Sequence, residues 1–130
     1  MLEKRSFYIN GKWISPSKSN DFEVINPSNE EAFAVISLGS AEDTNLAVEA
    51  AKKAFVKWKE TSKEERINLL EKLLKIYKKR FNEMSEAMSK EMGAPIDFAT
   101  SVHTASGQSH LEDFILRLKN FKFEEYFQTK

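Results

Sequence analysis

The first part of the chain alternates apolar and polar residues, a pattern that predicts short strands. Aromatic and branched residues flank the pair Asn10-Gly11, which predicts a hairpin because both turn positions need a positive φ. Further extended segments are predicted over 22–26 and 32–38, separated by the turn residues Ser, Asn and Glu. Residues 1–39 are therefore expected to form strands and turns.

After this region the period becomes that of an α-helix. Ser40 is the expected N-cap, and the acidic residues that follow it suit the positive end of a helix dipole. The apolar positions then recur at steps of one, three and four residues, at Leu46, Ala47, Ala50, Ala51, Ala54, Phe55 and Trp58. This stripe predicts an amphipathic helix over 40–60, with small residues that allow close approach of another element.

Two more helical regions are predicted, over 62–92 and 97–120. The first opens with a capping-box pattern and ends at a glycine followed by a proline. A single helix of this length would be unusually long, so we expect a break near residues 80–82. Gly107 in the last region indicates a kink or a close packing contact. The alternation in 121–127 suggests entry into a strand.

The composition supports one small α+β unit and excludes several functions. The chain has 130 residues, balanced charge and no cysteine, so disulfides, thiolate metal sites and a cysteine nucleophile are excluded from it. Neither a basic surplus nor a long apolar run is present, so we expect no nucleic-acid or membrane partner. The N-terminus lacks the apolar core of a signal peptide, which predicts a cytoplasmic location.

The sequence also lacks the usual patterns of a catalytic site. The glycines are too far apart to form a phosphate-binding loop. His103 and His110 are separated by two helical turns, which is too far for one tetrahedral ion. Adjacent glutamates diverge on a helix and do not form a pair for acid–base chemistry. The residues alone therefore predict a domain without an active site.

Several motifs follow one another along the chain, among them the segments Tyr8-Ile9-Asn10-Gly11-Lys12-Trp13, Phe22-Glu23-Val24-Ile25-Asn26-Pro27 and Glu91-Met92-Gly93-Ala94-Pro95. This ordered set resembles the N-terminal segment of the NAD(P)-dependent aldehyde dehydrogenase superfamily. The resemblance runs from about Phe7 to Pro95 and continues more weakly to Phe123. It implies a fold fragment in which a β-hairpin and short strands are followed by three to four amphipathic helices. These elements would form the outer layer of a cofactor-binding domain, without its nucleotide fold.

The same resemblance carries expectations about chemistry. The intact family oxidises aldehydes to carboxylic acids with NAD(P)+, using a cysteine nucleophile and a glutamate general base that lie after the matched region. This chain would then be a truncated member that holds no catalytic or cofactor-binding residue, and no activity or cofactor is expected from it alone. The alternative is a non-catalytic interaction or oligomerisation module on the same scaffold.

One family site falls partly inside the chain. Many members hold a monovalent cation with backbone carbonyls just before the Asn-Pro pair and with an acid near the glycine that ends the helix. These positions match Val24, Ile25 and Glu91, while the alternative is that Glu91 is only a surface acid. The apolar helix stripes would otherwise be exposed, so we expect self-association, or a partner that supplies the missing C-terminal portion.

Overall fold

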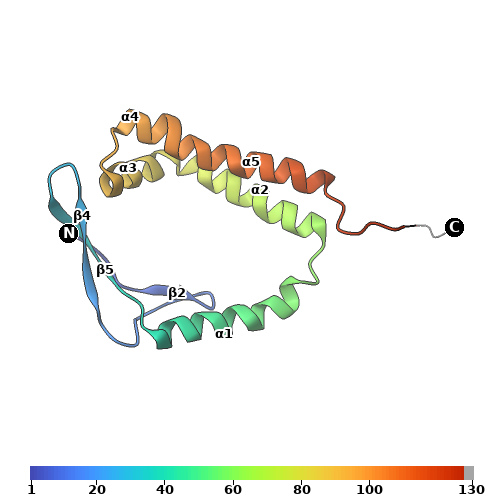
Figure 1. The fold of residues 1–130 in the computed structure, drawn as a ribbon, viewed down its shortest axis with the longest axis horizontal. Coiled ribbons are helices and arrows are strands. Elements are labelled where there is room, and N and C mark those ends of the chain that lie inside the picture. Colours follow the sequence, from blue (N-terminus) through green and yellow to red (C-terminus); the bar gives the residue numbers. More distant parts are fainter. Residues whose placement is uncertain (128–130) are drawn as a thin grey trace. The chain divides into compact units, whose positions relative to one another are not determined.

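The computed structural model describes residues 1–127, which form two units (Figure 1). The N-terminal unit contains residues 1–60 and 87–95, and the helical unit contains 61–86 and the residues from Ile96 onward. Short strands precede the helices along the chain, as the predicted α+β fold class requires. Within the described residues, no helix is both long enough and apolar enough to cross a bilayer.

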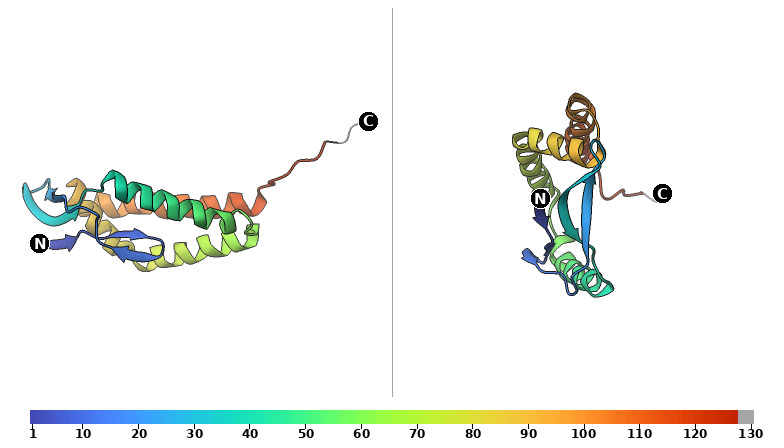
Figure 2. Two further views of the ribbon diagram at one scale, coloured as in Figure 1. Left: turned by 90° about the horizontal axis from the view of Figure 1, so that it is seen from below. Right: turned by 90° about the vertical axis from the view of Figure 1, so that its left-hand side faces the viewer.

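The N-terminal unit contains a three-stranded sheet of order β1-β5-β4. Strand β4 (Asp21–Asn26) pairs antiparallel with β5 (Glu31–Ser37), with an irregular register between Val24 and Ile25. The turn between them closes at Asn26, whose carbonyl accepts the backbone N–H of Glu30 at 2.8 Å. These two strands run together as a long twisted ribbon (Figure 2). The predicted extended segments are confirmed.

Strand β1 (Leu2–Lys4) was not predicted from the sequence. It pairs in parallel with β5, with Glu3 opposite Val35. Its three residues are all exposed, so they carry no alternation between a buried and a polar face that a pattern could reveal. Its partner β5 does carry a buried face, on which Val35 and Ser37 lie, and Ala34 is buried on the opposite face.

The predicted hairpin is confirmed as strands β2 (Phe7–Ile9) and β3 (Lys12–Ile14). Asn10 and Gly11 adopt φ values of 53° and 76°, which is the left-handed conformation that the turn requires. The rings of Tyr8 and Trp13 face each other across the strands with their centroids 5.2 Å apart. The hairpin contacts α1 (Ala41–Trp58) and covers part of the small-residue face of this helix.

The start of α1 is fixed by a polar cluster. Ser40 is the N-cap, as predicted, and it forms a reciprocal capping box with Asp43. The Asp43 carboxylate also accepts the backbone N–H of Ser17 at 2.8 Å, which ties the loop before β4 to the helix. Asp43 is the one residue of α1 that is buried, so the helix is most firmly attached at its polar start, while the hairpin covers its small-residue face only in part.

The helical unit consists mainly of α2 (Lys63–Lys79) and α5 (Ala105–Asn120), which lie side by side (Figure 1). Their buried apolar residues are Ile67 and Ile115, with Ala99 from the π-helix η1 (Ala99–Thr104). The chain enters η1 through the short helix α4 (Ile96–Phe98). The π-helix was not predicted, because its residues fit an ordinary helical pattern equally well.

Gly107 marks a close packing contact, one of the two expectations raised for it. A Cβ at this position would collide with the hydroxyl of Tyr77 and lie 3.0 Å from its Cζ. The Tyr77 hydroxyl donates to the carbonyl of Thr104 at 2.9 Å. The hydroxyl of Ser85 donates to that of Thr104, also at 2.9 Å, and both residues are buried. A satisfied polar network therefore holds α2 against the start of α5.

The predicted helix break is confirmed at Arg80, which caps α2 immediately before α3 (Phe81–Met92). The second capping box, Ser62 with Glu65, is also confirmed. The strand suggested for 121–127 is wrong, because no residue of this segment joins a strand ladder. Instead, the rings of Phe121 and Phe123 contact each other edge to face, with their centroids 4.9 Å apart.

Candidate functional site

The candidate cation ligands all belong to the N-terminal unit. Val24 and Ile25 lie on β4, on either side of the register irregularity. Both residues have partners on β5, Ala34 and Ala32, and the residue skipped by the register is Phe33. Glu91 is the second-to-last residue of α3 and is exposed. Within residues 1–127 its carboxylate has no hydrogen bond or ion pair, which leaves its oxygens accessible.

A close backbone contact brings the end of α3 to the end of β4. Gly93 ends the helix with a φ of 70°, and a Cβ there would lie 3.1 Å from the Cβ of Pro27. A side chain at position 93 would therefore be both strained and crowded. The hydroxyl of Ser89 donates to the carbonyl of Ala94 at 2.7 Å, which also fixes this helix end. Gly93 is two residues after Glu91, and Pro27 is two residues after Ile25, so the contact lies next to all of the candidate ligands in sequence.

This arrangement can supply hard oxygen atoms to a cation. Two backbone carbonyls and one carboxylate are ligands of the type that bind alkali and alkaline-earth ions. They form an incomplete set, because such ions take six or more oxygens. Among the described residues, no group of three or more carboxylate or histidine side chains could hold a metal ion.

A hollow of about 340 Å³ lies between the hairpin and α1. Its floor is the small-residue face of the helix, formed by Ala47, Ala50, Ala51 and Ala54. A second hollow of about 430 Å³ continues towards the start of the helix and reaches Asp43. The first hollow is lined mainly by small apolar side chains, whereas the second also has the polar residues Ser6, Asp43 and Thr44 in its wall.

Asp43 is the strongly perturbed acid of the N-terminal unit, and its role is structural. Hydrogen bonds from the backbone of Ser40 and Ser17 lower the pKa of its carboxyl from 3.8 to about 2. The carboxylate stays ionised at neutral pH because three donors stabilise the charged form. A general acid or base needs a pKa near the working pH, so Asp43 does not fit that role.

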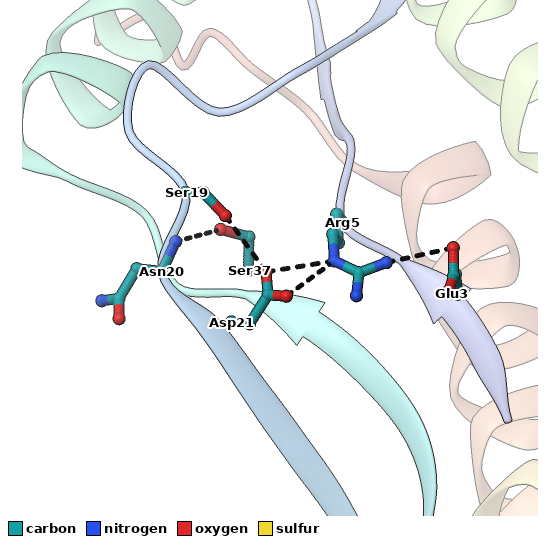
Figure 3. A network of polar contacts seen from close by, with 6 residues as sticks. All are labelled: Glu3, Arg5, Ser19, Asn20, Asp21 and Ser37. Carbon is teal, nitrogen blue, oxygen red and sulfur yellow. Dashed lines mark hydrogen bonds and ion pairs between the residues drawn. The ribbon is translucent and has the colours of Figure 1, made fainter.

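A polar network links β1 to the start of β4 (Figure 3). The Nε of Arg5 donates to both carboxylate oxygens of Asp21 at 3.0 Å, and its guanidinium also pairs with Glu3 at 3.1 Å. The backbone N–H of Asn20 donates to the Ser37 hydroxyl on the neighbouring strand. All these contacts are between residues of the sheet and its loops, so the network orders the sheet edge.

The two histidines do not form a site. His103 lies in η1 with its ring 5.0 Å from that of Phe98, edge to face, whereas His110 is exposed on α5. The glycines at positions 11, 39, 93 and 107 belong to separate elements, so no backbone cradle for a pyrophosphate is formed from them.

The sequence was compared with known families and proteins. Residues 13–129 match the aldehyde dehydrogenase family. A 3-succinoylsemialdehyde-pyridine dehydrogenase of a Pseudomonas species is 38% identical over 130 residues. The match covers 99% of this chain but 27% of that relative. The chain therefore spans about a quarter of the length of the curated relatives that it matches.

Solved structures give the same result. The crystal structure of an aldehyde dehydrogenase from Bartonella henselae has a TM-score of 0.95 and 55% identity, covering 96% of this chain and 26% of that one. An aldehyde dehydrogenase C variant from Pseudomonas syringae, solved with NAD+ and octanal, has a TM-score of 0.93 and 32% identity. The match covers 95% of this chain and 26% of the Pseudomonas syringae chain. The similarity thus extends over nearly all of the elements described above.

Proposed function

We propose that this chain, which belongs to the aldehyde dehydrogenase family, forms the N-terminal layer of an enzyme that oxidises aldehydes to carboxylic acids with NAD(P)+. One observation carries the proposal, namely the family match over residues 13–129. The solved relative from Pseudomonas syringae, bound to NAD+ and octanal, supports the cofactor and the substrate class.

The chemistry of such an enzyme must come from outside these residues. The family's covalent step needs a cysteine thiolate, and this sequence contains no cysteine. NAD(P)+ would accept the hydride when bound, and the residues described here provide no cradle for it. The role of this layer is therefore to support the domain that binds the cofactor.

An assay of the purified chain tests this assignment. The chain is mixed with a short and a long aliphatic aldehyde and with NAD+ or NADP+, and reduced nucleotide is followed at its absorption maximum. We expect no aldehyde-dependent signal above the buffer control. Turnover by the chain alone would contradict the claim that the reacting groups lie elsewhere.

The cation site is part of the same proposal. Val24 and Ile25 would supply backbone carbonyls, and Glu91 a carboxylate, to a monovalent cation. The close contact between Gly93 and Pro27 supports this cation site, because the contact keeps the end of α3 near the end of β4. Potassium should raise the melting temperature relative to an equal concentration of choline, and Glu91→Gln should remove that difference. Glu86→Gln, one helix turn and a half earlier, is the control and should leave the difference unchanged.

A second candidate function is a non-catalytic interaction module on this scaffold. It is favoured by the large number of exposed apolar side chains on the helices, among them Phe55, Leu73 and Phe114. Sedimentation of the chain at micromolar concentration discriminates the two. A defined oligomer would favour the module, and a monomer would favour the layer of a larger enzyme. A cytoplasmic location and an oligomeric state stay predictions.

A further inference from the structure

We propose that the hydroxyls of Tyr77 and Ser85 are positioning groups that keep one extra residue within the π-helix η1, and that they thereby set the orientation of α4 relative to α5. Both hydroxyls act on Thr104, the last residue of η1. Without them, η1 would become an ordinary α-helical turn and α4 would be displaced. The inference goes beyond the proposed function, because it concerns a conformational choice inside the helical unit.

The helical segment that contains η1 can adopt two registers. In a π-helix each backbone N–H bonds to the carbonyl five residues earlier, whereas in an α-helix it bonds to the carbonyl four residues earlier. Helices α4, η1 and α5 follow one another without a break from Ile96 to Asn120. The wide turn of η1 therefore accommodates one residue more than an α-helix would. In the α register, that residue would turn α4 by about 100° and move it by about 1.5 Å relative to α5.

The contact between Phe98 and His103 identifies the π register. Their rings lie edge to face with the centroids 5.0 Å apart, although five residues separate them in the sequence. Side chains five positions apart on an α-helix point about 140° away from each other. In a π-helix the same two positions follow each other along one face, because the hydrogen bonds join residues five apart. The ring pair would therefore separate if η1 became α-helical.

A buried polar cluster fixes the end of η1. The Tyr77 hydroxyl donates to the carbonyl of Thr104, and the Ser85 hydroxyl donates to the hydroxyl of Thr104, each at 2.9 Å. Thr104 is fully buried, and Ser85 is 2% exposed. We call these three residues the Thr104 cluster. Because a buried polar group is costly when it lacks a partner, positions of Thr104 that break either bond are disfavoured.

The ring of Tyr77 is held independently of its hydroxyl. It packs edge to face against Phe81, with the centroids 6.3 Å apart. The hydroxyl reaches the helix backbone because Gly107, three residues after Thr104, has no side chain to exclude it. The hydroxyl of Tyr77 can therefore be removed while the packing of its ring is kept.

Exposed hydroxyls beside η1 loosen the α-helical ladder without selecting a register. Thr100, Ser101 and Ser106 each donate to the carbonyl four residues earlier, at 2.7, 2.7 and 2.6 Å. Hydroxyl bonds of this kind bend helices and slightly destabilise them, so they make a wide turn easier to form. They are exposed, and water can replace them. The buried Thr104 cluster is the part that fixes where the wide turn ends.

NMR of the chain can report the register, because the sequence has two histidines in different surroundings. His103 lies beside Phe98, and His110, exposed on α5, is an internal control. Phe98→Leu removes the ring and gives the Hε1 shift of His103 without it. Tyr77→Phe removes the proposed positioning hydroxyl. Tyr8→Phe is the matched control, since it removes an exposed tyrosine hydroxyl from the hairpin.

Tyr77→Phe should move the His103 resonance to the position that Phe98→Leu gives, and should leave His110 unchanged. Tyr8→Phe should move neither resonance. A His103 resonance that keeps its original position in Tyr77→Phe would overturn the proposal, because the π register would then persist without the hydroxyl. An unchanged His103 in Phe98→Leu would overturn it as well, because the rings would not be in contact. If Tyr77→Phe does not unfold cooperatively, Ser85→Ala removes the other donor and is judged by the same shifts.

Two single-residue deletions test the extra residue itself. Ser101 lies in η1 and Ser109 in the regular part of α5, and both are exposed. Deletion of Ser101 turns the wide turn into an α-helical one with both flanks in place, so it should lower the melting temperature by less than about half as much as deletion of Ser109, which rotates one flank by about 100°. Equal losses would overturn the proposal.

The same deletion makes the positioning hydroxyl dispensable. With Ser101 removed, four residues separate Phe98 from His103, which keeps their rings on one face of an α-helix. Tyr77→Phe in this background should therefore leave the His103 resonance in place. A shift as large as in the full-length chain would show that the hydroxyl acts on something other than the register, and would overturn the proposal.

Discussion

Helices α1 and α2 have similar sequence patterns but opposite attachments in their own units. Both begin with a capping box and carry an apolar stripe. Helix α2 buries Ile67 and holds α5 through the hydroxyl of Tyr77. Helix α1 buries only Asp43, while Phe55 and Trp58 at its other end are exposed. An amphipathic pattern therefore predicts that a helix has an apolar face, but not which part of that face finds a partner.

The largest effect is expected at the close contact inside the helical unit. Gly107→Val should destabilise the unit by about 3 kcal/mol, because overpacking costs roughly 1–3 kcal/mol and displacement of Tyr77 would lose its hydrogen bond to Thr104, worth about 1 kcal/mol. Urea unfolding followed by circular dichroism measures this change. Gly39→Ala is the matched glycine control, since its nearest atom would lie 3.7 Å away, and it should be close to neutral.

A second variant checks the cause of that loss. Tyr77→Phe removes the hydroxyl that a side chain at position 107 would meet. Combined with Gly107→Val, it should cost clearly less than the sum of the two single changes. Additive losses would show that the contact between these residues is not the source of the destabilisation.

The next effect concerns the two helix caps. Ser62→Ala should cost about 1 kcal/mol, whereas Ser40→Ala should approach about 2 kcal/mol. The difference arises because the Ser40 hydroxyl also lies 2.8 Å from the hydroxyl of Ser17, so its loss loosens a loop as well as a helix. Hydrogen exchange of the amides of α1 and α2 measures each cap separately. A greater loss of stability from Ser62→Ala than from Ser40→Ala would contradict the extra contact assigned to Ser40.

Acid should weaken the start of α1. The pKa of Asp43 is lowered to about 2 in the folded chain, against 3.8 ordinarily. The stabilisation is therefore complete above about pH 4 and is lost as the pH falls through 2. Backbone hydrogen bonding from Ser62 also lowers the pKa of Glu65. A carbon-detected NMR titration of the Asp43 carboxyl should show this low midpoint, and a midpoint near 4 would refute the donor cluster.

The smallest effect is expected at the exposed interhelix ion pairs. Glu71→Gln removes the partner of Lys119, yet it should lower the melting temperature by no more than about 2 °C, because exposed pairs contribute little. The effect should vanish in high salt. A large, salt-independent loss would mean that this edge of the helix pair is not a simple solvated surface.

Local chemistry made much of the fold predictable. The turn at Asn10-Gly11, the caps at Ser40 and Ser62 and the break at Arg80 each follow from the preferences of a few adjacent residues. The candidate cation ligands came from a resemblance rather than from a pattern in the residues.

Features that depend on distant partners were missed. Strand β1 exists only through its pairing with β5, and the π-helix η1 has no distinct sequence pattern. The aromatic alternation after Phe121 predicted a strand, but the described residues offer it no strand partner and the rings pair with each other. An alternating pattern forms a strand only when another strand is present to pair with it.

The central claim is that this chain provides a supporting layer whose chemistry lies in the rest of an aldehyde dehydrogenase. The most direct test compares aldehyde-dependent NAD+ reduction by the chain alone with that of the chain joined to the remaining part of the Bartonella henselae relative. The account predicts no activity for the first and clear activity for the second. Activity of the chain alone, or a folded joined protein that oxidises no aldehyde, would contradict it.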